Sequence, residues 1–198
     1  MNPPAPLDRT AIRREVRAQR RSLSERERSL RSHALCLNLA RSGLLARARR
    51  IACFWPNDGE VDLAPLFARL WQTGTRIFLP VLAGPRLWFA PFHPHTRLAD
   101  NRFGIPEPVA SRRQACPLLA LDIVLMPLVA FDGRGNRLGM GGGYYDRTFA
   151  SRAHRTHLRR PLLVGAAFAF QRREHLEARP WDVALDAAIT DRGFEWLR

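Results

Sequence analysis

The chain has no lysine. Its 32 basic residues are all arginines and are set against 18 acidic residues, so the formal net charge at pH 7 is +14. A Walker A phosphate loop, which contains a lysine followed by serine or threonine, is therefore excluded. Guanidinium groups attract nucleic acids, acidic membrane surfaces and small polyanions alike. Because the arginines are spread along the chain without an RNA-binding signature or a zinc finger, we do not expect nucleic acid to be the partner.

Cysteines and long apolar runs are also scarce. Cys36, Cys53 and Cys116 are odd in number and widely spaced, which is typical of free thiols in a reducing cytoplasm and not of a disulfide framework or a zinc site. The longest apolar run, residues 123–131, contains a proline and is too short to cross a bilayer. Residues 1–7 are rich in proline and do not resemble a signal peptide. We expect a disordered lead-in there and a cytoplasmic protein without a membrane partner.

The remaining pattern predicts one α/β domain over residues 1–198. A chain of this length can bury a single core, and short strand-like apolar runs alternate with helical periodicity. Such alternation predicts a layered domain with a mostly parallel central sheet flanked by helices. Between residues 91 and 118 we expect irregular chain. Helices are predicted over residues 9–21, 25–42, 63–73 and 144–155, the third capped by Asp62, and strands over residues 51–55, 76–81, 87–90, 122–126 and 162–168, with a final strand near residue 190.

Four arginines recur along one side of the first predicted helix. Arg9, Arg13, Arg17 and Arg20 follow the spacing i, i+4, i+8 and i+11, which places them on one face. A charged face of this kind is usually solvated. The alternative is an arginine ladder directed at phosphates, because guanidinium forks suit bidentate contacts. The sequence leaves both interpretations open.

The most distinctive segment is residues 136–147, which contain a glycine block at residues 139–143. It has four glycines within five residues, and it follows an apolar run and precedes a predicted helix. Glycines expose backbone N–H groups to a ligand, and a loop between strand and helix often binds phosphate. The dinucleotide fingerprint does not apply, because Tyr144 stands where a third glycine is required. Asp146 could hold Mg²⁺ that bridges phosphate oxygens or simply cap the helix.

The turn from Trp55 to Glu60 follows another predicted strand. Ligands of parallel α/β sheets bind beyond the carboxyl ends of the strands. We therefore expect this turn and the glycine block to open onto one cleft.

Taken together, these segments resemble the 5-formyltetrahydrofolate cyclo-ligase family, also called 5,10-methenyltetrahydrofolate synthetases. The glycine block is the most specific match. The basic N-terminal helix and residues 59–62, 104–108 and 181–190 fall in the family's order, so the resemblance covers almost the whole chain. It implies an ATP- and Mg²⁺-dependent ligase that converts 5-formyltetrahydrofolate to 5,10-methenyltetrahydrofolate, with release of ADP and phosphate, through a phosphorylated formyl group.

The resemblance also implies roles for individual residues. It assigns Arg137 and Tyr145 to catalysis, Asp146 to Mg²⁺, and Asp182 to Mg²⁺ as a weaker candidate. The folate-binding positions are Trp55, Glu60, Phe103 and Tyr145. The ATP-binding positions are Arg9, Arg13, Arg137, Leu138, Gly139, Met140, Gly141, Gly142, Gly143, Tyr144 and Tyr145.

Three positions depart from the family's usual pattern. Arg9 stands where lysine is common, and some members have basic residues where Met140 and Gly142 stand. Arginine at position 9 keeps the charge but changes its geometry. We expect a monomeric enzyme with a small-molecule substrate. The alternatives are a basic nucleic-acid-binding protein and a folate-binding protein of this fold without turnover.

Overall fold

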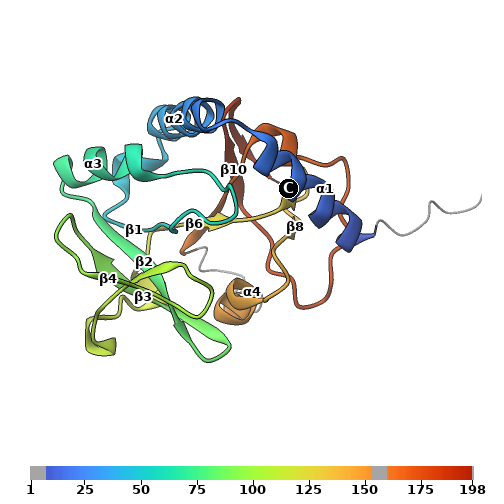
Figure 1. Cartoon of the computed structure of the whole chain (residues 1–198). Coiled ribbons are helices and arrows are strands. Elements are labelled where there is room, and N and C mark those ends of the chain that lie inside the picture. Colours follow the sequence, from blue (N-terminus) through green and yellow to red (C-terminus); the bar gives the residue numbers. More distant parts are fainter. Residues whose placement is uncertain (1–7, 153–159, 198) are drawn as a thin grey trace, which may run out of the picture.

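The computed structural model describes residues 8–152 and 160–197. The expected disordered lead-in at residues 1–7 and the end of the helix predicted to reach Arg155 lie outside these ranges. Figure 1 shows a central sheet with the long helices on one side and a short helix on the other. The helices are α1 (Arg9–Ser22), α2 (Glu25–Arg41), α3 (Ala64–Gln72) and α4 (Tyr144–Phe149).

Seven strands form the main sheet, and the prediction of a mostly parallel α/β sheet is confirmed. β6 lies in the middle, and its first four residues are buried, as the apolar run predicts. The four inner pairings are parallel, whereas both outermost pairings, β2–β3 and β10–β11, are antiparallel. The strand order is β11 (Gly193–Trp196), β10 (Ala187–Thr190), β9 (Leu162–Ala166), β6 (Ile123–Pro127), β1 (Arg50–Ala52), β2 (Arg76–Ala83) and β3 (Arg86–Phe92).

Local sequence explains where the helices begin. The Asp8 side chain accepts a hydrogen bond from the Thr10 N–H at 2.8 Å and caps α1. Ser24 and Glu27 form the predicted capping box of α2. The predicted cap of α3 is one residue early, because Leu63 occupies the N-cap position. Asp62 still accepts a hydrogen bond from the Ala64 N–H at 2.9 Å.

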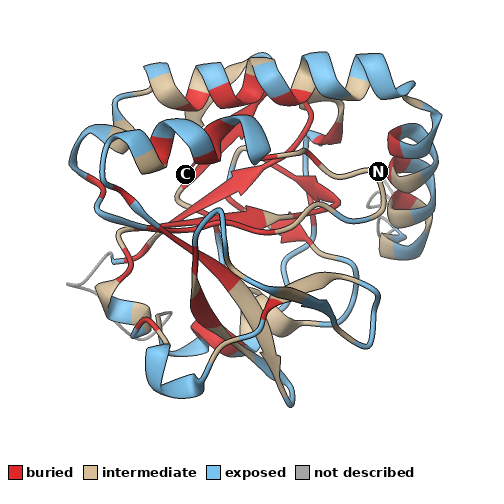
Figure 2. Cartoon of the chain, turned by 60° about the vertical axis from the view of Figure 1, so that its left-hand side comes forward, coloured by how far each residue is buried: buried red, intermediate tan, exposed pale blue. Residues whose placement is uncertain are grey.

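The two faces of the sheet bury separate cores, since successive strand residues point to opposite sides. Ile51 and Leu125 pack in the core beneath α2 and α3, whereas Ala52 and Val124 pack in the core on the α4 side. Figure 2 shows the buried residues concentrated in the strands and on the inner sides of the helices. A third, small cluster lies under α1 and joins Ile12 and Val16 to four residues: Val129, Ala130, Leu138 and Leu176.

Two further strand pairs and one edge strand were not predicted. The stretch expected to be irregular contains a hairpin of β4 (Leu98–Asp100) and β5 (Pro106–Pro108). A second small pair, β7 (Ala130–Phe131) and β8 (Arg137–Leu138), leads into the glycine block. β11 adds an edge strand after the predicted last one. None of the helices in the described ranges is both long enough and apolar enough to cross a membrane.

Candidate functional site

One large cavity collects the predicted site residues. It encloses about 970 Å³ and lies between α1, the turn after β1, the β4–β5 hairpin and the glycine block. Its position beyond the ends of β1 and β6 is where parallel α/β sheets bind ligands. The predicted residues that line it are Arg9, Arg13, Trp55, Glu60, Phe103, Arg137, Gly139, Met140, Gly141, Gly142, Gly143, Tyr144, Tyr145, Asp146 and Asp182.

Leu138 is the predicted residue that does not line this cavity. Its side chain is buried in the small cluster under α1, together with Ile12 and Val16. Contact between this side chain and a nucleotide is therefore excluded in this conformation. The leucine instead fixes the strand from which the glycine block departs.

The glycine block lines the cavity and has backbone donors without a partner among the described residues. Its carbonyls face arginines: Arg13 Nε donates to the Gly139 oxygen at 2.9 Å, and an Arg147 nitrogen donates to the Gly142 oxygen. Within the described residues, none of the five N–H groups from Gly139 to Gly143 donates a hydrogen bond. Gly143 has φ of 62°, a left-handed conformation that favours glycine, and starts α4. Such a run of free N–H groups suits an anion.

Arg137 and Asp146 form a nearly buried ion pair beside this block. Their closest nitrogen and oxygen are 2.5 Å apart, and the side chains are 4% and 16% exposed. Asp146 Oδ1 also accepts from the Val183 N–H at 3.1 Å. Because Gly143 is the N-cap of α4 and no side chain caps that helix, the interpretation of Asp146 as a helix cap is wrong. The carboxylate instead points to Arg137.

The arginines of α1 are not a solvated face. Arg9 pairs with Asp182 at 2.9 Å, Arg13 contacts the glycine block, and the Arg20 side chain is fully buried. Burial lowers the pKa of Arg13, and the neighbouring charges of Arg9 and Arg179 lower it further. Arg9 and Arg13 line the cavity, as the ladder interpretation requires, whereas Arg17 and Arg20 bind Asp58.

The turn after β1 holds two carboxylates in different environments. Asp58, with φ of 51°, accepts from Arg17 at 2.7 Å, Arg20 at 2.9 Å and Arg21 at 2.6 Å. Burial favours a higher pKa for Asp58, but these three hydrogen bonds together lower it to about 2. Asp58 is therefore a firmly ionised anchor.

Glu60 is the second carboxylate, and it faces the cavity. Burial raises its pKa to about 7, against the attraction of Arg20 and the hydrogen bond from the Asn57 N–H. Tyr145 lies close by, and burial, followed by the charge of Glu60, raises the pKa of its phenol. Its hydroxyl has no hydrogen-bond partner among the described residues. A neutral phenol and a carboxyl that titrates near neutrality together offer donors and an acceptor to a polar ring.

Aromatic rings supply the walls on this side. Trp55 packs edge-on against Phe92 at 6.0 Å between ring centroids. Phe103 is 53% exposed and lies edge-on to Tyr144 at 6.0 Å. Such half-open faces suit a flat heterocycle.

Several lining residues were not predicted. Trp181 is 64% exposed, with the Arg179 guanidinium 5.7 Å from its ring centroid. Glu107 Oε1 accepts from the Leu82 N–H at 3.0 Å and from Asn101 at 2.7 Å. The sequence offered a signal for both, because Trp181 and Glu107 lie in the segments 181–190 and 104–108 that match the family's order. Periodicity carries no information about an exposed tryptophan or a carboxylate bound to a distant strand.

The carboxylates fit only a metal ion that takes most of its ligands from elsewhere. Within residues 8–152 and 160–197, no three His, Cys, Asp or Glu side chains form a metal-binding group. Asp146 and Asp182 each line the cavity as single carboxylates already paired with arginine. Mg²⁺ bound to phosphates typically uses one or two carboxylates together with phosphate oxygens and water.

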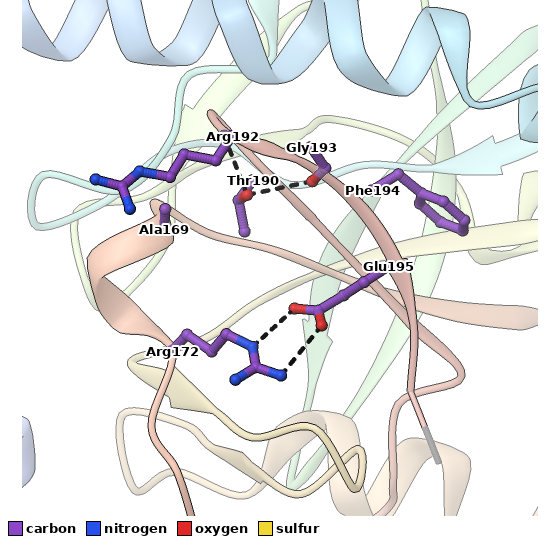
Figure 3. A pocket seen from close by; sticks show the side chains of 7 residues that line it. All are labelled: Ala169, Arg172, Thr190, Arg192, Gly193, Phe194 and Glu195. Carbon is purple, nitrogen blue, oxygen red and sulfur yellow. Dashed lines mark hydrogen bonds and ion pairs between the residues drawn. The ribbon is translucent and has the colours of Figure 1, made fainter.

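A second, shallow hollow lies at the β10–β11 edge of the sheet and encloses about 250 Å³ (Figure 3). Arg172 pairs there with Glu195 at 3.1 Å, and Thr190 Oγ1 bonds the Gly193 carbonyl at 3.2 Å. The Thr190 bond closes the turn between β10 and β11, and the Arg172–Glu195 pair ties β11 to the segment after β9. None of the predicted site residues lines this hollow.

Sequence comparison identifies the family of the chain. The model of the 5-formyltetrahydrofolate cyclo-ligase family matches residues 7–191. The chain belongs to this family. Among relatives, the 5-formyltetrahydrofolate cyclo-ligase of Escherichia coli K12 is 37% identical over 185 residues, which are 91% of this chain and all of that one. The Haemophilus influenzae cyclo-ligase is 38% identical over 89% of this chain and 94% of its own length.

Solved structures of the family share the fold. The 5,10-methenyltetrahydrofolate synthetase of Aquifex aeolicus superposes with a TM-score of 0.80 and 34% identity, covering 96% of this chain and 93% of that one. The synthetase of Mycoplasma pneumoniae gives 0.72 and 26% identity, covering 93% and 99%. The cyclo-ligase resemblance of the sequence is thereby confirmed.

Proposed function

We infer that this chain is a 5-formyltetrahydrofolate cyclo-ligase. It uses ATP to close 5-formyltetrahydrofolate to 5,10-methenyltetrahydrofolate and releases ADP and phosphate. The observation that carries this inference is a single cavity of about 970 Å³ with two chemically different walls. One wall has arginines and free backbone N–H groups, and the other has aromatic rings and Glu60. Family membership agrees with the pairing of a nucleotide and a folate.

The site residues divide between these two walls. ATP supplies the phosphoryl group that turns the formyl oxygen into a leaving group when N10 closes on the formyl carbon. Arg9, Arg13 and the glycine block bind the triphosphate, and Arg137 stabilises the charge on the transferred phosphoryl group. Their work is positioning and charge neutralisation, since the nucleophile comes from the substrate.

The folate wall binds and orients the reduced pterin. Trp55 and Phe103 pack against the ring, and Glu60 accepts hydrogen bonds from its N–H groups. Tyr145 reaches the junction of the two walls, because its ring lies 5.9 Å from the Arg137 guanidinium and its phenol is near Glu60. A neutral tyrosine there orients the formyl oxygen.

The magnesium ion and the biological setting are further parts of the proposal. Asp146 would hold Mg²⁺, with Asp182 as a weaker candidate, and the ion would neutralise charge on the phosphates. The three cysteines are free and buried, which is in keeping with the predicted cytoplasmic location. A monomer with neither nucleic acid nor membrane as partner stays a prediction.

The deciding experiment follows the absorbance of the methenyl product. The purified protein, shown to be folded by circular dichroism, is given 5-formyltetrahydrofolate with ATP and Mg²⁺. We expect product only when all three are present, and folded protein without turnover would contradict the inference. Calorimetry with 5-formyltetrahydrofolate then identifies a folate-binding protein without turnover. Tight, steeply salt-dependent binding of RNA or DNA would instead support the nucleic-acid alternative.

A further inference from the structure

We propose that Arg20 is a positioning residue, which holds Glu60 in place for the folate and links the folate wall to the glycine block. The proposal rests on the function inferred above. It adds a residue that lies outside the cavity lining and therefore acts through its neighbours.

The guanidinium of Arg20 contacts three groups from two distant segments. Nη2 lies 2.9 Å from Asp58 Oδ2 and 3.8 Å from Met140 Sδ, and Nη1 lies 3.6 Å from Glu60 Oε1. Glu60 belongs to the folate wall and Met140 to the glycine block. Arg20 thus stands directly behind both walls.

Because Arg20 is fully buried, its charge is costly to desolvate, and stability alone does not explain why an arginine stands here. Arg20 is 0% exposed, and its Nε and Nη1 atoms have no hydrogen-bond partner among the described residues. A buried cation with unused donors is a weak stabilising device, and an apolar side chain of the same volume often serves stability better. The geometry therefore points to a role in positioning Glu60.

Two other arginines already neutralise Asp58. Arg17 and Arg21 bond its carboxylate at 2.7 and 2.6 Å, and both are partly exposed. Neither has a recorded contact with Glu60 or Met140 within the described ranges. The contacts to Glu60 and Met140 distinguish Arg20 from its neighbours.

The backbone strengthens the link. A Cβ atom added at Gly59 would lie 3.3 Å from the Arg20 carbonyl oxygen, so the turn rests directly against α1. The same helix carries Arg13, whose Nε bonds the Gly139 carbonyl. α1 therefore contacts both the turn that carries Glu60 and the glycine block.

The test compares Arg20→Met with Arg21→Met. Both changes remove one arginine from Asp58, but only the first removes a contact to Glu60. We expect Arg20→Met to raise KM for 5-formyltetrahydrofolate about tenfold or more, with KM for ATP changed less than threefold, and Arg21→Met to stay within twofold of wild type. Arg20→Lys keeps the charge but not the fork, and we expect an intermediate KM. If Arg20→Met does not fold, Arg20→Lys is the variant whose KM values test the proposal.

A double-mutant cycle with Glu60→Gln separates positioning from a general structural effect. If Arg20 acts through Glu60, its replacement adds less than threefold to KM in the Glu60→Gln background. Full additivity, or equal changes in the two KM values, would overturn the proposal. The pH profile of kcat/KM is a second readout: with Arg20 gone, the inflection from Glu60 moves to higher pH. Asp58 and Tyr145 are the other titratable groups facing Glu60; Asp58 loses one arginine in that variant but keeps Arg17 and Arg21, and Arg21→Met is the control for this loss.

Failure of the proposed function gives a different result. A wild-type protein that binds 5-formyltetrahydrofolate by calorimetry without turning it over contradicts the ligase function only. The same variants are then compared by Kd, and less than twofold weakening in Arg20→Met would overturn the role of Arg20. Absence of both turnover and binding in wild type would overturn both proposals.

Discussion

The two walls of the cavity are fixed by different interactions. In the glycine block, arginine side chains hold the backbone carbonyls and leave the N–H groups from Gly139 to Gly143 free. In the turn from Trp55 to Glu60, three arginines converge on the single carboxylate of Asp58. The N–H groups of the block thus have no partner among the described residues, whereas the turn already contains its own counter-charge. Anion binding is expected to reorganise the block more than the turn.

The largest effect is expected at Arg137, on the nucleotide wall. Arg137→Ala removes the charge proposed to stabilise the transferred phosphoryl group, and such groups contribute about 100-fold or more to kcat. Steady-state rates measure the loss. The variant also leaves Asp146 unpaired, so thermal unfolding is measured in parallel and Arg137→Lys serves as the charge-preserving control. A folded Arg137→Ala with a near-normal rate would assign the phosphate charge to other arginines.

The second effect concerns the metal. Asp146→Asn keeps the shape of the side chain but removes the carboxylate proposed to hold Mg²⁺, and we expect the Mg²⁺ concentration for half-maximal rate to rise about tenfold or more. Asp182→Asn is the matched comparison and should shift it less. Equal magnesium dependence in wild type and Asp146→Asn would contradict the assignment.

The third effect tests the folate wall. At pH 8, above its pKa of about 7, Glu60 is mostly ionised, so Glu60→Gln removes a charged acceptor there. A hydrogen bond to a charged group contributes about 1.5–3 kcal/mol, or roughly 10- to 100-fold in binding. KM for 5-formyltetrahydrofolate should rise by that order while KM for ATP stays within threefold. Parallel changes in the two constants would show that the walls are not separate.

The two carboxylates of the turn should give opposite pH dependences of stability. Burial raises the pKa of Glu60 from 4.5 to about 7, so the folded protein favours its protonated form, and this contribution is lost as pH rises from about 4.5 through about 7. It amounts to about 3 kcal/mol at most. Urea unfolding of wild type and Glu60→Gln at pH 5 and 8 measures it. A stability difference independent of pH would rule it out.

Asp58 has the reverse sign. Its pKa of about 2, lowered from 3.8 by three arginines against the effect of burial, gives a contribution that is present above about pH 3.8 and lost as pH falls toward 2. Acid unfolding of wild type and Asp58→Asn tests this. The two curves should converge at low pH.

The smallest effect is expected at Phe103. Its ring is 53% exposed, lies edge-on to Tyr144 and has the Arg102 guanidinium 5.0 Å from its centroid. Phe103→Ala should raise KM for the folate only a few-fold and leave unfolding unchanged, since little buried area is lost. Phe103→Leu is the control for loss of the aromatic face alone. A loss as large as that of Glu60→Gln would make this loop a principal part of the folate wall.

Much of the fold was predictable from local sequence signals. The caps at Asp8 and Ser24 and the apolar run of β6 are encoded by neighbouring residues, and each was predicted. The β4–β5 hairpin was missed because Pro106 and Pro108 indicate extended loop, although proline is tolerated at strand edges. β11 was missed because it has only four residues and begins with glycine.

The site was predicted in its membership but not in its internal contacts. Family resemblance identified residues that the structure brings together around one cavity, with Leu138 as the exception. Their chemical roles stay predictions. Periodicity placed Arg20 on the same face as Arg9 but could not show that it is buried against Asp58, 38 positions away. Such a contact depends on how α1 docks, which no local pattern encodes.

The way α1 is attached has a consequence for dynamics. Its apolar contribution to the core is confined to Ile12 and Val16 in a small cluster, and the rest of its attachment is ionic. Segments with little buried apolar surface open at lower free energy than the whole domain. We therefore expect the amides of α1 to exchange with deuterium before those of β6, faster at high salt and more slowly with both ligands bound. Local opening of α1 thus costs less free energy than unfolding of the whole domain, and we expect bound substrates to raise that cost.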